Sequence, residues 1–182
     1  MTTAHWQELY DSLVVKNHIG DPHPLPTDED CDRFEQESGL RLPSSYRAFI
    51  KVFGPGVFGC SLEITAPMSC NERWDLAEAN RGYQMSPTEW GRVVPAKADL
   101  GSRLFFFGCE EEQDPLAWDP QDVRDAEGSE YAIYRLTLDD LEFVAASFRE
   151  LVDAKCEQMF APDPKWDEAE LGPQRLFWKG SA

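Results

Sequence analysis

Apolar residues recur with helical spacing in three stretches of the chain. The pattern predicts an amphipathic helix over residues 3–16, a second over residues 43–53, and a long third helix from residue 141 to about residue 158. Their predicted buried faces carry, in chain order, Trp6, Leu9, Tyr10 and Leu13; then Tyr46, Phe49, Ile50 and Phe53; then Leu141, Val144, Ala145, Phe148, Leu151 and Val152.

A further helix is predicted from its ends, between the first two. Thr27 is a favourable N-cap residue, and the three acidic residues after it lie where a helix N-terminus favours negative charge. Gly39 is a favourable residue just beyond the last turn. Pro43 fits the first turn of the next helix, which the run Gly54-Pro55-Gly56 should end.

Strands are predicted in the middle of the chain, over residues 57–65, 103–108, 115–119 and 130–136. The run at 103–108, RLFFFG, is typical of a strand buried on both faces. A weaker helix is predicted over about residues 71–83, and a loop with Pro87 and Pro95 follows it. Helices first, antiparallel strands next and a closing helix favour an α+β fold, in which an antiparallel sheet packs against several helices.

The length of 182 residues fits one domain, and the 42% hydrophobic and 12% aromatic content argues against disorder. We predict a body at residues 27–158, an N-terminal helix and linker at residues 1–26, and an extension at residues 159–182 that packs on the domain. That extension carries Trp166, Phe177 and Trp178. The chain has neither a signal-like N-terminus nor a stretch apolar enough for a membrane span, and its five cysteines form no C-x-x-C pair. We therefore expect a cytoplasmic protein with reduced thiols.

The strongest feature of the composition is a net charge of −17, with 34 acidic against 17 basic residues. Nucleic-acid-binding proteins usually carry a basic patch, and anionic membranes repel an acidic surface. The sequence therefore predicts neither a nucleic-acid nor a membrane partner. Two interpretations remain: the charge serves solubility alone, or it steers a basic protein partner toward this chain. The oligomeric state is left open.

The sequence contains no convincing motif for catalysis or cofactor binding. Gly54-x-Gly56-x-x-Gly59 matches the dinucleotide fingerprint, but it follows a predicted helix and precedes a strand, the reverse of what pyrophosphate binding needs. The three histidines lie in the first helix and its linker without a partner at metal-ligand spacing. We predict no metal, no cofactor and no catalytic residue. A pair of carboxylates that meet in a deep pocket would revive an enzymatic interpretation.

One acidic cluster stands apart from the rest of the chain. Residues 104–123 contain six acids and no lysine or arginine, with a tryptophan among them. This stretch is either a solvated hairpin turn beside a core tryptophan, or an acidic patch with an aromatic centre that binds basic residues of a partner. The predicted partner-binding residues are Glu110, Glu111, Glu112, Asp114, Trp118 and Asp119.

Residues 31–56, CDRFEQESGLRLPSSYRAFIKVFGPG, resemble the hallmark segment of the SUKH superfamily, the Smi/Knr-type proteins. The matching positions are Glu35, Gly39, Leu42, Pro43, Tyr46 and Phe49, with Ile50 in place of the usual leucine. Gly54-Pro55-Gly56 departs from the Asn-Gly-Gly that the family often has at this turn. The later landmarks are similar in order: an apolar strand at 104–108, an acidic turn at 110–114, a strand at 116–119, and Ser147-Phe148 near the start of a helix.

This resemblance, over roughly residues 27–158, implies a scaffold that binds other proteins. Many bacterial members are implied to be immunity proteins that neutralise secreted nuclease or deaminase toxins by direct binding, while fungal relatives are regulatory adaptors in cell-wall signalling. We therefore expect a non-enzymatic immunity protein whose partner is a basic toxin domain. A regulatory or scaffold adaptor without a toxin partner is the alternative. A toxin gene directly upstream would distinguish the two.

Overall fold

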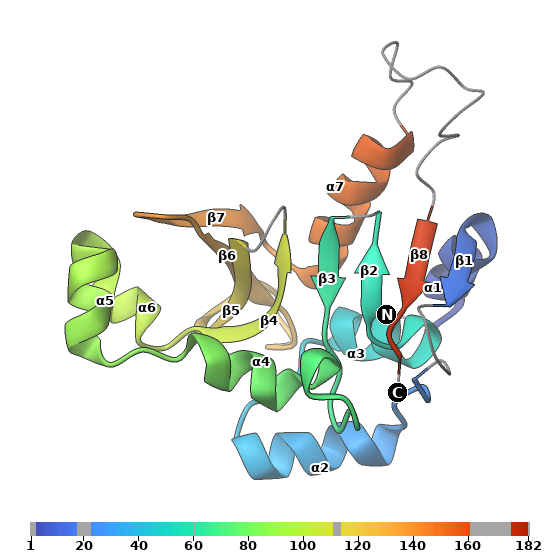
Figure 1. The fold of residues 1–182 in the computed structure, drawn as a ribbon, viewed down its shortest axis with the longest axis horizontal. Helices are drawn as coiled ribbons and strands as arrows, with labels where there is room; N and C mark the ends of the chain where they lie inside the picture. The colour runs from blue at the N-terminus through green and yellow to red at the C-terminus, as the bar shows by residue number, and fades with distance from the viewer. Residues whose placement is uncertain (1–2, 18–22, 60, 111–113, 161–175, 182) are drawn as a thin grey trace.

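The computed structural model describes residues 3–17, 23–59, 61–110, 114–160 and 176–181 (Figure 1). Within them the helices are α1 Thr3–Ser12, α2 Asp28–Ser38, α3 Ser44–Phe53, α4 Leu76–Tyr83, α5 Pro87–Val93, α6 Ala98–Gly101 and α7 Phe148–Phe160, with 3-10 turns at Glu72–Trp74 and Pro95–Lys97. The strands are β1 Val14–Asn17, β2 Gly56–Phe58, β3 Leu62–Ile64, β4 Phe105–Glu110, β5 Asp114–Val123, β6 Tyr131–Leu136, β7 Leu141–Ala145 and β8 Leu176–Lys179.

All of these strands belong to one sheet, in the order β1-β8-β2-β3-β4-β5-β6-β7. The β1–β8 pair is parallel and the other pairs are antiparallel, so the sheet is mixed. The predicted α+β class is confirmed, as a single domain with one continuous sheet. The parallel β1–β8 pair was not predicted.

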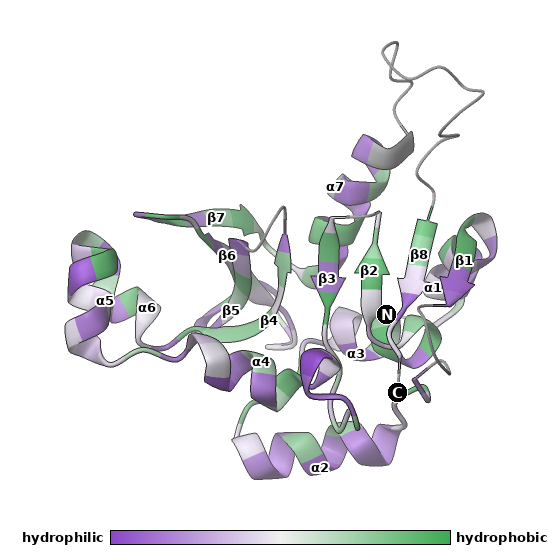
Figure 2. Cartoon of the chain, viewed as in Figure 1, coloured by the Kyte–Doolittle hydropathy of each residue, from purple (hydrophilic) through white to green (hydrophobic). Residues whose placement is uncertain are grey.

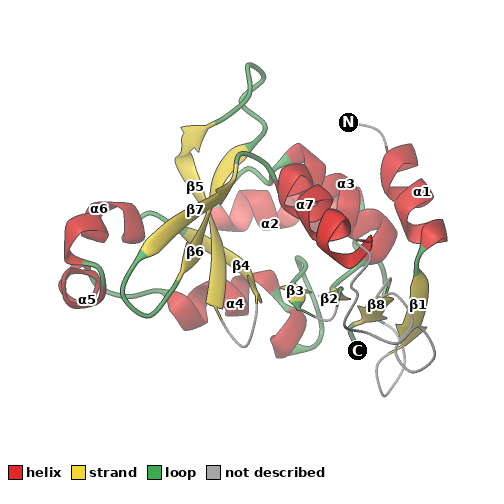
Figure 3. Cartoon of the chain, turned by 90° about the horizontal axis from the view of Figure 1, so that it is seen from above, coloured by secondary structure: helices red, strands yellow, loops and turns green. Residues whose placement is uncertain are grey.

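Helices cover the sheet unevenly. Figure 3 shows α2, α3 and α7 on one side of strands β4–β7, and α5 and α6 on the other. The larger core lies on the first side and is built from aromatic rings, among them the completely buried Tyr46, Phe49, Phe107 and Phe148. A smaller core around Trp90 and Phe106 fills the second side. The hydropathy view shows α2 as largely polar, although Cys31 and Phe34 are buried beneath it (Figure 2).

The hallmark segment folds as the sequence predicts. Thr27 caps α2 through a capping box with Asp30, and Gly39 ends the helix at φ 71°. Pro43 directly precedes α3 as its N-cap rather than lying inside its first turn, and Gly54 follows the last turn. Because the Pro43 side chain offers no cap, Glu130 supplies one: its carboxylate accepts hydrogen bonds from the backbone N–H of Ser45 and from both serine hydroxyls of this turn.

Several predicted elements differ from the observed ones. The strand expected at 57–65 is the hairpin β2–β3, in which Gly59 takes φ 61°. The helix expected over 3–16 ends at Ser12 and gives way to β1, because those residues pair with β8. The helix expected from residue 141 begins at Phe148, and the residues before it form β7 against β6.

Two further regions also differ from prediction. The loop expected around Pro87 contains α5, in which Pro87 occupies the first turn and Ser86 forms a capping box with Glu89. The C-terminal extension adds a strand that the sequence did not predict, since β8 is inserted between β1 and β2 with Phe177 completely buried. Trp166 lies outside the described residues.

Candidate functional site

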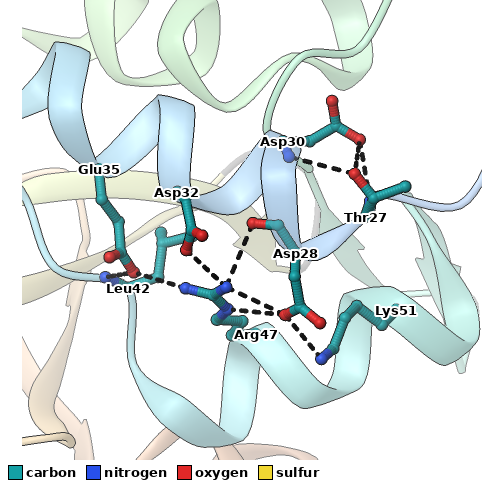
Figure 4. A network of polar contacts seen from close by, with 8 residues as sticks. All are labelled: Thr27, Asp28, Asp30, Asp32, Glu35, Leu42, Arg47 and Lys51. Atoms are coloured by element: carbon teal, nitrogen blue, oxygen red, sulfur yellow. Dashed lines mark hydrogen bonds and ion pairs between the residues drawn. The ribbon is translucent and has the colours of Figure 1, made fainter.

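The most acidic described surface element is α2, and its carboxylates converge on one arginine of α3 (Figure 4). Arg47 contacts three of them: its Nη2 lies 3.0 Å from Asp28 Oδ1 and 2.7 Å from Asp32 Oδ1, and its Nη1 lies 3.5 Å from Glu35 Oε1. Lys51, one turn further along α3, lies 2.9 Å from Asp28. The two helices are therefore joined by charge at their outer surface as well as by apolar packing beneath.

The electrostatics of this network favour the charged forms of Arg47 and Asp28. Burial alone would lower the pKa of Arg47, but its hydrogen bonds to Asp32 and Asp28 outweigh burial and hold the pKa above its ordinary value. The hydrogen bond from Lys51, followed by that from Arg47, lowers the pKa of Asp28. Carboxylates held ionised and paired in this way are poor proton donors, so this network favours a structural role over acid–base chemistry.

Glu35 connects the end of α2 to the segment that leads into α3. Its Oε1 accepts a hydrogen bond of 3.0 Å from the backbone N–H of Leu42, seven residues along the chain. The same oxygen faces Arg47. Glu35 thereby satisfies a backbone donor in the segment between α2 and α3 and connects that segment to Arg47.

Replacing Glu35 with alanine should lower the free energy of unfolding by about 1–2 kcal/mol, because the backbone N–H of the buried Leu42 loses its acceptor. Glu35→Gln is the matched control, since an amide oxygen can still accept from Leu42, and it should cost less than about 1 kcal/mol. Urea unfolding of the three proteins measures both values. Equal losses in the two variants would mean that the charge, and not the hydrogen bond to Leu42, is what matters.

An open hollow of about 430 Å³ lies beside this network. Asp32, Glu35, Gln36, Gly39 and Arg41 line it. Its lining contains no serine, cysteine, lysine or histidine, and its carboxylates Asp32 and Glu35 both contact Arg47. Such a shallow polar hollow suits contact with a protein surface better than enclosure of a small substrate.

The predicted acidic cluster divides into buried and turn residues. Glu110, at the end of β4, is only 6% exposed; its carboxylate pairs with Lys155 of α7, which is 5% exposed, and lies 3.4 Å from Arg135 of β6. Asp114, the first residue of β5, is half-buried. Glu111 and Glu112 lie outside the described residues. The turn between β4 and β5 therefore begins with an internal ion pair, so Glu110 is not available as a partner contact.

Trp118 and Asp119 were predicted as partner contacts, and their placement corrects that expectation. Both are completely buried. The Trp118 ring stacks on Phe107 at 4.3 Å and meets Tyr46 edge-on at 4.8 Å, which makes it a core residue. Asp119 accepts hydrogen bonds from both Nε and Nη2 of Arg103, at 2.8–3.1 Å. An aromatic ring and a carboxylate that are already enclosed cannot reach a second protein in this conformation.

Two structural polar residues were missed by the sequence reasoning. Glu130 caps α3 from 85 residues away, and Lys155 lies buried within an amphipathic helix where a solvated lysine would be expected. Nothing in the local pattern marks Glu130 as a cap, since that role depends on two segments that meet only in the fold. One local signal was present for Lys155: an apolar residue on each side of it one turn away would have placed it on the buried face.

Three further features would indicate another kind of function: a metal-binding group, a nucleotide-binding loop or a membrane-spanning helix. Over these residues no group of three or more His, Cys, Asp or Glu side chains is arranged to hold a metal ion. The Gly54–Gly59 motif lies between the end of α3 and the β2–β3 turn, so it does not open a helix, as its context predicts. None of the helices that the structure describes has the length and apolar character needed to cross a membrane.

Comparison with known families gives one clear match. The model of the SMI1 / KNR4 family (SUKH-1) matches residues 25–154, more than two thirds of the chain. No curated protein and no solved structure matches the chain significantly. The matched region contains α2, the Glu35–Arg47 network, α3 and strands β2 to β7. The chain belongs to the SMI1 / KNR4 family, SUKH-1.

Proposed function

We propose that this protein is a non-enzymatic binding module of the cytoplasm, which neutralises a nuclease- or deaminase-type toxin by binding it directly. Membership of the SUKH-1 family carries this proposal, because the resemblance implies that many bacterial members of the superfamily are immunity proteins. The net charge of −17 supports a basic partner, since nucleases carry basic clefts for their substrates. A regulatory adaptor is the alternative within the same family.

The polar clusters described above support a binding role over catalysis. Three carboxylates of α2 contact Arg47, and the buried carboxylates Glu110 and Asp119 each have a cationic partner. Groups engaged in this way maintain the scaffold. The remaining exposed acids give the surface its negative field, which attracts a basic partner before contact and accelerates association.

Inhibition of a toxin tests the proposal directly. Candidate nuclease or deaminase domains encoded beside the gene of this chain would be purified, and their rates measured with and without one equivalent of the chain. We expect near-complete inhibition at a 1:1 ratio, with the heat-denatured chain as control. Full toxin activity in the presence of the folded chain would refute the immunity role. Stable binding to a protein that has no toxin activity would favour the adaptor.

We expect the β4–β5 turn to steer this association. Neutralising Glu111, Glu112 and Asp114 together should slow association with the toxin domain several-fold at low salt. The difference should shrink as salt screens the field. Glu110 is left unchanged because it is buried and paired with Lys155. Stopped-flow kinetics over a range of salt concentrations measures the effect.

A matched control removes the same charge elsewhere. Neutralising the exposed Glu8, Glu29 and Glu37, on α1 and α2 away from the turn, changes the net charge equally (Figure 1). If both triple variants slow association by the same factor, the turn has no special place and the charge acts as a whole. If neither does, the acidic surface serves solubility alone.

A further inference from the structure

The sheet has two edge strands, and they differ in how they are protected. β1 at one end is four residues long and carries the exposed Lys16, a residue type that discourages pairing with another chain. β7 at the other end has the sequence LEFVA, with no lysine and no proline. No strand among the described residues pairs with the outer edge of β7, which is the last strand of the sheet (Figure 1).

The hydrogen bonds around β7 indicate which backbone groups face outward. Thr137 N–H donates to Asp140 C=O, so Thr137 and Asp140 form a hydrogen-bonded pair that continues the β6–β7 ladder. In an antiparallel ladder, hydrogen-bonded and non-hydrogen-bonded pairs alternate. The register then directs the backbone of Glu142 toward β6 and that of Leu141 and Phe143 away from it. The hydrogen bonds of Leu141 are consistent with this orientation, because its backbone groups bond outside β6: its N–H donates to the Asp140 side chain, and its C=O accepts from Lys97 Nζ. Phe143 is thus the position at which the edge stays open.

The side chains around this open position resemble those at the centre of protein interfaces. Phe143 is 50% exposed, and its ring contacts Tyr134 at 5.9 Å and lies under the guanidinium of Arg124 at 5.0 Å. Arg124 in turn pairs with Asp122 at 2.5 Å. Tyrosine and arginine are enriched among residues that dominate binding energy, and half-exposed aromatic rings supply area that a partner can bury.

The edge is also continuous with the acidic turn. Arg135 of β6 contacts Glu142 of β7 at 2.8 Å and Glu110 at the start of the turn at 3.4 Å. One arginine therefore spans from the β7 edge to the turn. A partner steered toward the turn arrives beside an open strand edge.

We infer that the toxin partner docks by adding an extended segment to the β7 edge, with its backbone bonded to Phe143 and its side chains on the Phe143–Tyr134 rings. This inference rests on the proposed function. Charge selects the occupant: a basic segment is attracted to a chain of net charge −17, whereas a second copy of this chain would be repelled. Backbone pairing supplies affinity without demanding one sequence, and the exposed rings favour an apolar residue opposite them.

Hydrogen exchange of the Phe143 amide tests the pairing in the unmodified protein. In the free chain this N–H should exchange rapidly, and in the complex with the toxin domain encoded beside the gene it should become protected by at least tenfold. The Val14 amide region of β1, at the opposite edge, should be unchanged. If toxin binds but the Phe143 amide exchanges as in the free chain, the docking mode is wrong while the proposed function stands.

Two substitutions of Phe143 distinguish the contribution of its backbone N–H to binding from that of its aromatic ring. Phe143→Thr keeps the N–H and should weaken toxin binding about tenfold, whereas Phe143→Pro also removes the donor and should weaken it about 100-fold. Proline is tolerated on an edge strand whose N–H faces solvent, so melting should change little. Val14→Pro at the other edge is the control and should bind like the wild type.

The outcomes distinguish the inference from the proposed function. Wild-type affinity in Phe143→Pro would overturn the β7 docking mode alone. A wild-type chain that binds no toxin domain would overturn the proposed function and this inference with it. Sedimentation should show a monomer; a dimer that dissociates on Phe143→Pro would mean that a second copy occupies the edge, and would also overturn the inference.

Discussion

Replacing Phe49 with alanine should lower the free energy of unfolding by about 3–5 kcal/mol. The side chain is completely buried at the centre of the larger core. Its ring stacks on Phe53 at 4.2 Å and meets Trp6 and Phe148 edge-on at 5.2 and 5.1 Å. Alanine would leave a cavity between three elements, α1, α3 and α7, none of which can close it alone.

Thermal or urea unfolding measures this loss, and a melting temperature lower by about 10 °C is expected for a chain of this size. Phe143→Ala is the matched control, since the same atoms leave a half-exposed site on β7, and it should cost less than about 1 kcal/mol. Toxin binding by Phe49→Ala should fall only to the extent that the protein unfolds. An unchanged melting point would mean that the hallmark segment does not build the core.

The elements that the sequence predicts well are those whose signals are local. Thr27, Gly39 and Gly54 carry the end signals of α2 and α3, and the structure places each of them at a helix end. The apolar run before Gly108 forms β4, with Phe106 and Phe107 buried toward the smaller and the larger core respectively. In each case a few neighbouring residues contain the whole signal.

The elements that were missed depend on partners far along the chain. β1 forms only because β8 pairs with it, more than 150 residues later. Residues 141–145 have apolar positions compatible with a helix, and pairing with β6 makes them a strand instead. The α5 error is different, because Ser86 and Glu89 have the spacing of a capping box and Pro87 suits a first turn, so the local signal was available.

The acidic segment was predicted to be an exposed partner surface, and the structure shows part of it buried. An acidic turn between two strands is present, yet Glu110 and Asp119 are buried beside cations from other elements, and Trp118 belongs to the core. Charge and aromaticity in a sequence do not tell which side of a strand a residue faces when the strand is buried on both faces. The open β7 edge was not predicted at all, because a helix was expected there.

Replacing Lys155 with methionine should lower the free energy of unfolding by about 3 kcal/mol. This loss is expected even though a buried charge is itself unfavourable and the substitution removes one. The Lys155 ammonium pairs with Glu110, and both side chains are almost completely buried. Without the lysine, the Glu110 carboxylate keeps only the longer contact with Arg135 at 3.4 Å. The main cost is therefore a buried carboxylate that has lost its nearest cation.

A double-mutant cycle separates the ion pair from the packing around it. Removing both charges, in Glu110→Met with Lys155→Met, should recover most of the loss and leave a cost of about 1 kcal/mol, since no uncompensated charge stays buried. Arg135 retains its contact with Glu142 at 2.8 Å in either variant. Urea unfolding of the four proteins gives the coupling energy. Additive losses in the double variant would show that the two side chains are screened by water and act separately. A strong coupling would mean that the end of β4 is anchored to α7 through the Glu110–Lys155 pair, directly before the acidic residues that we expect to steer a partner.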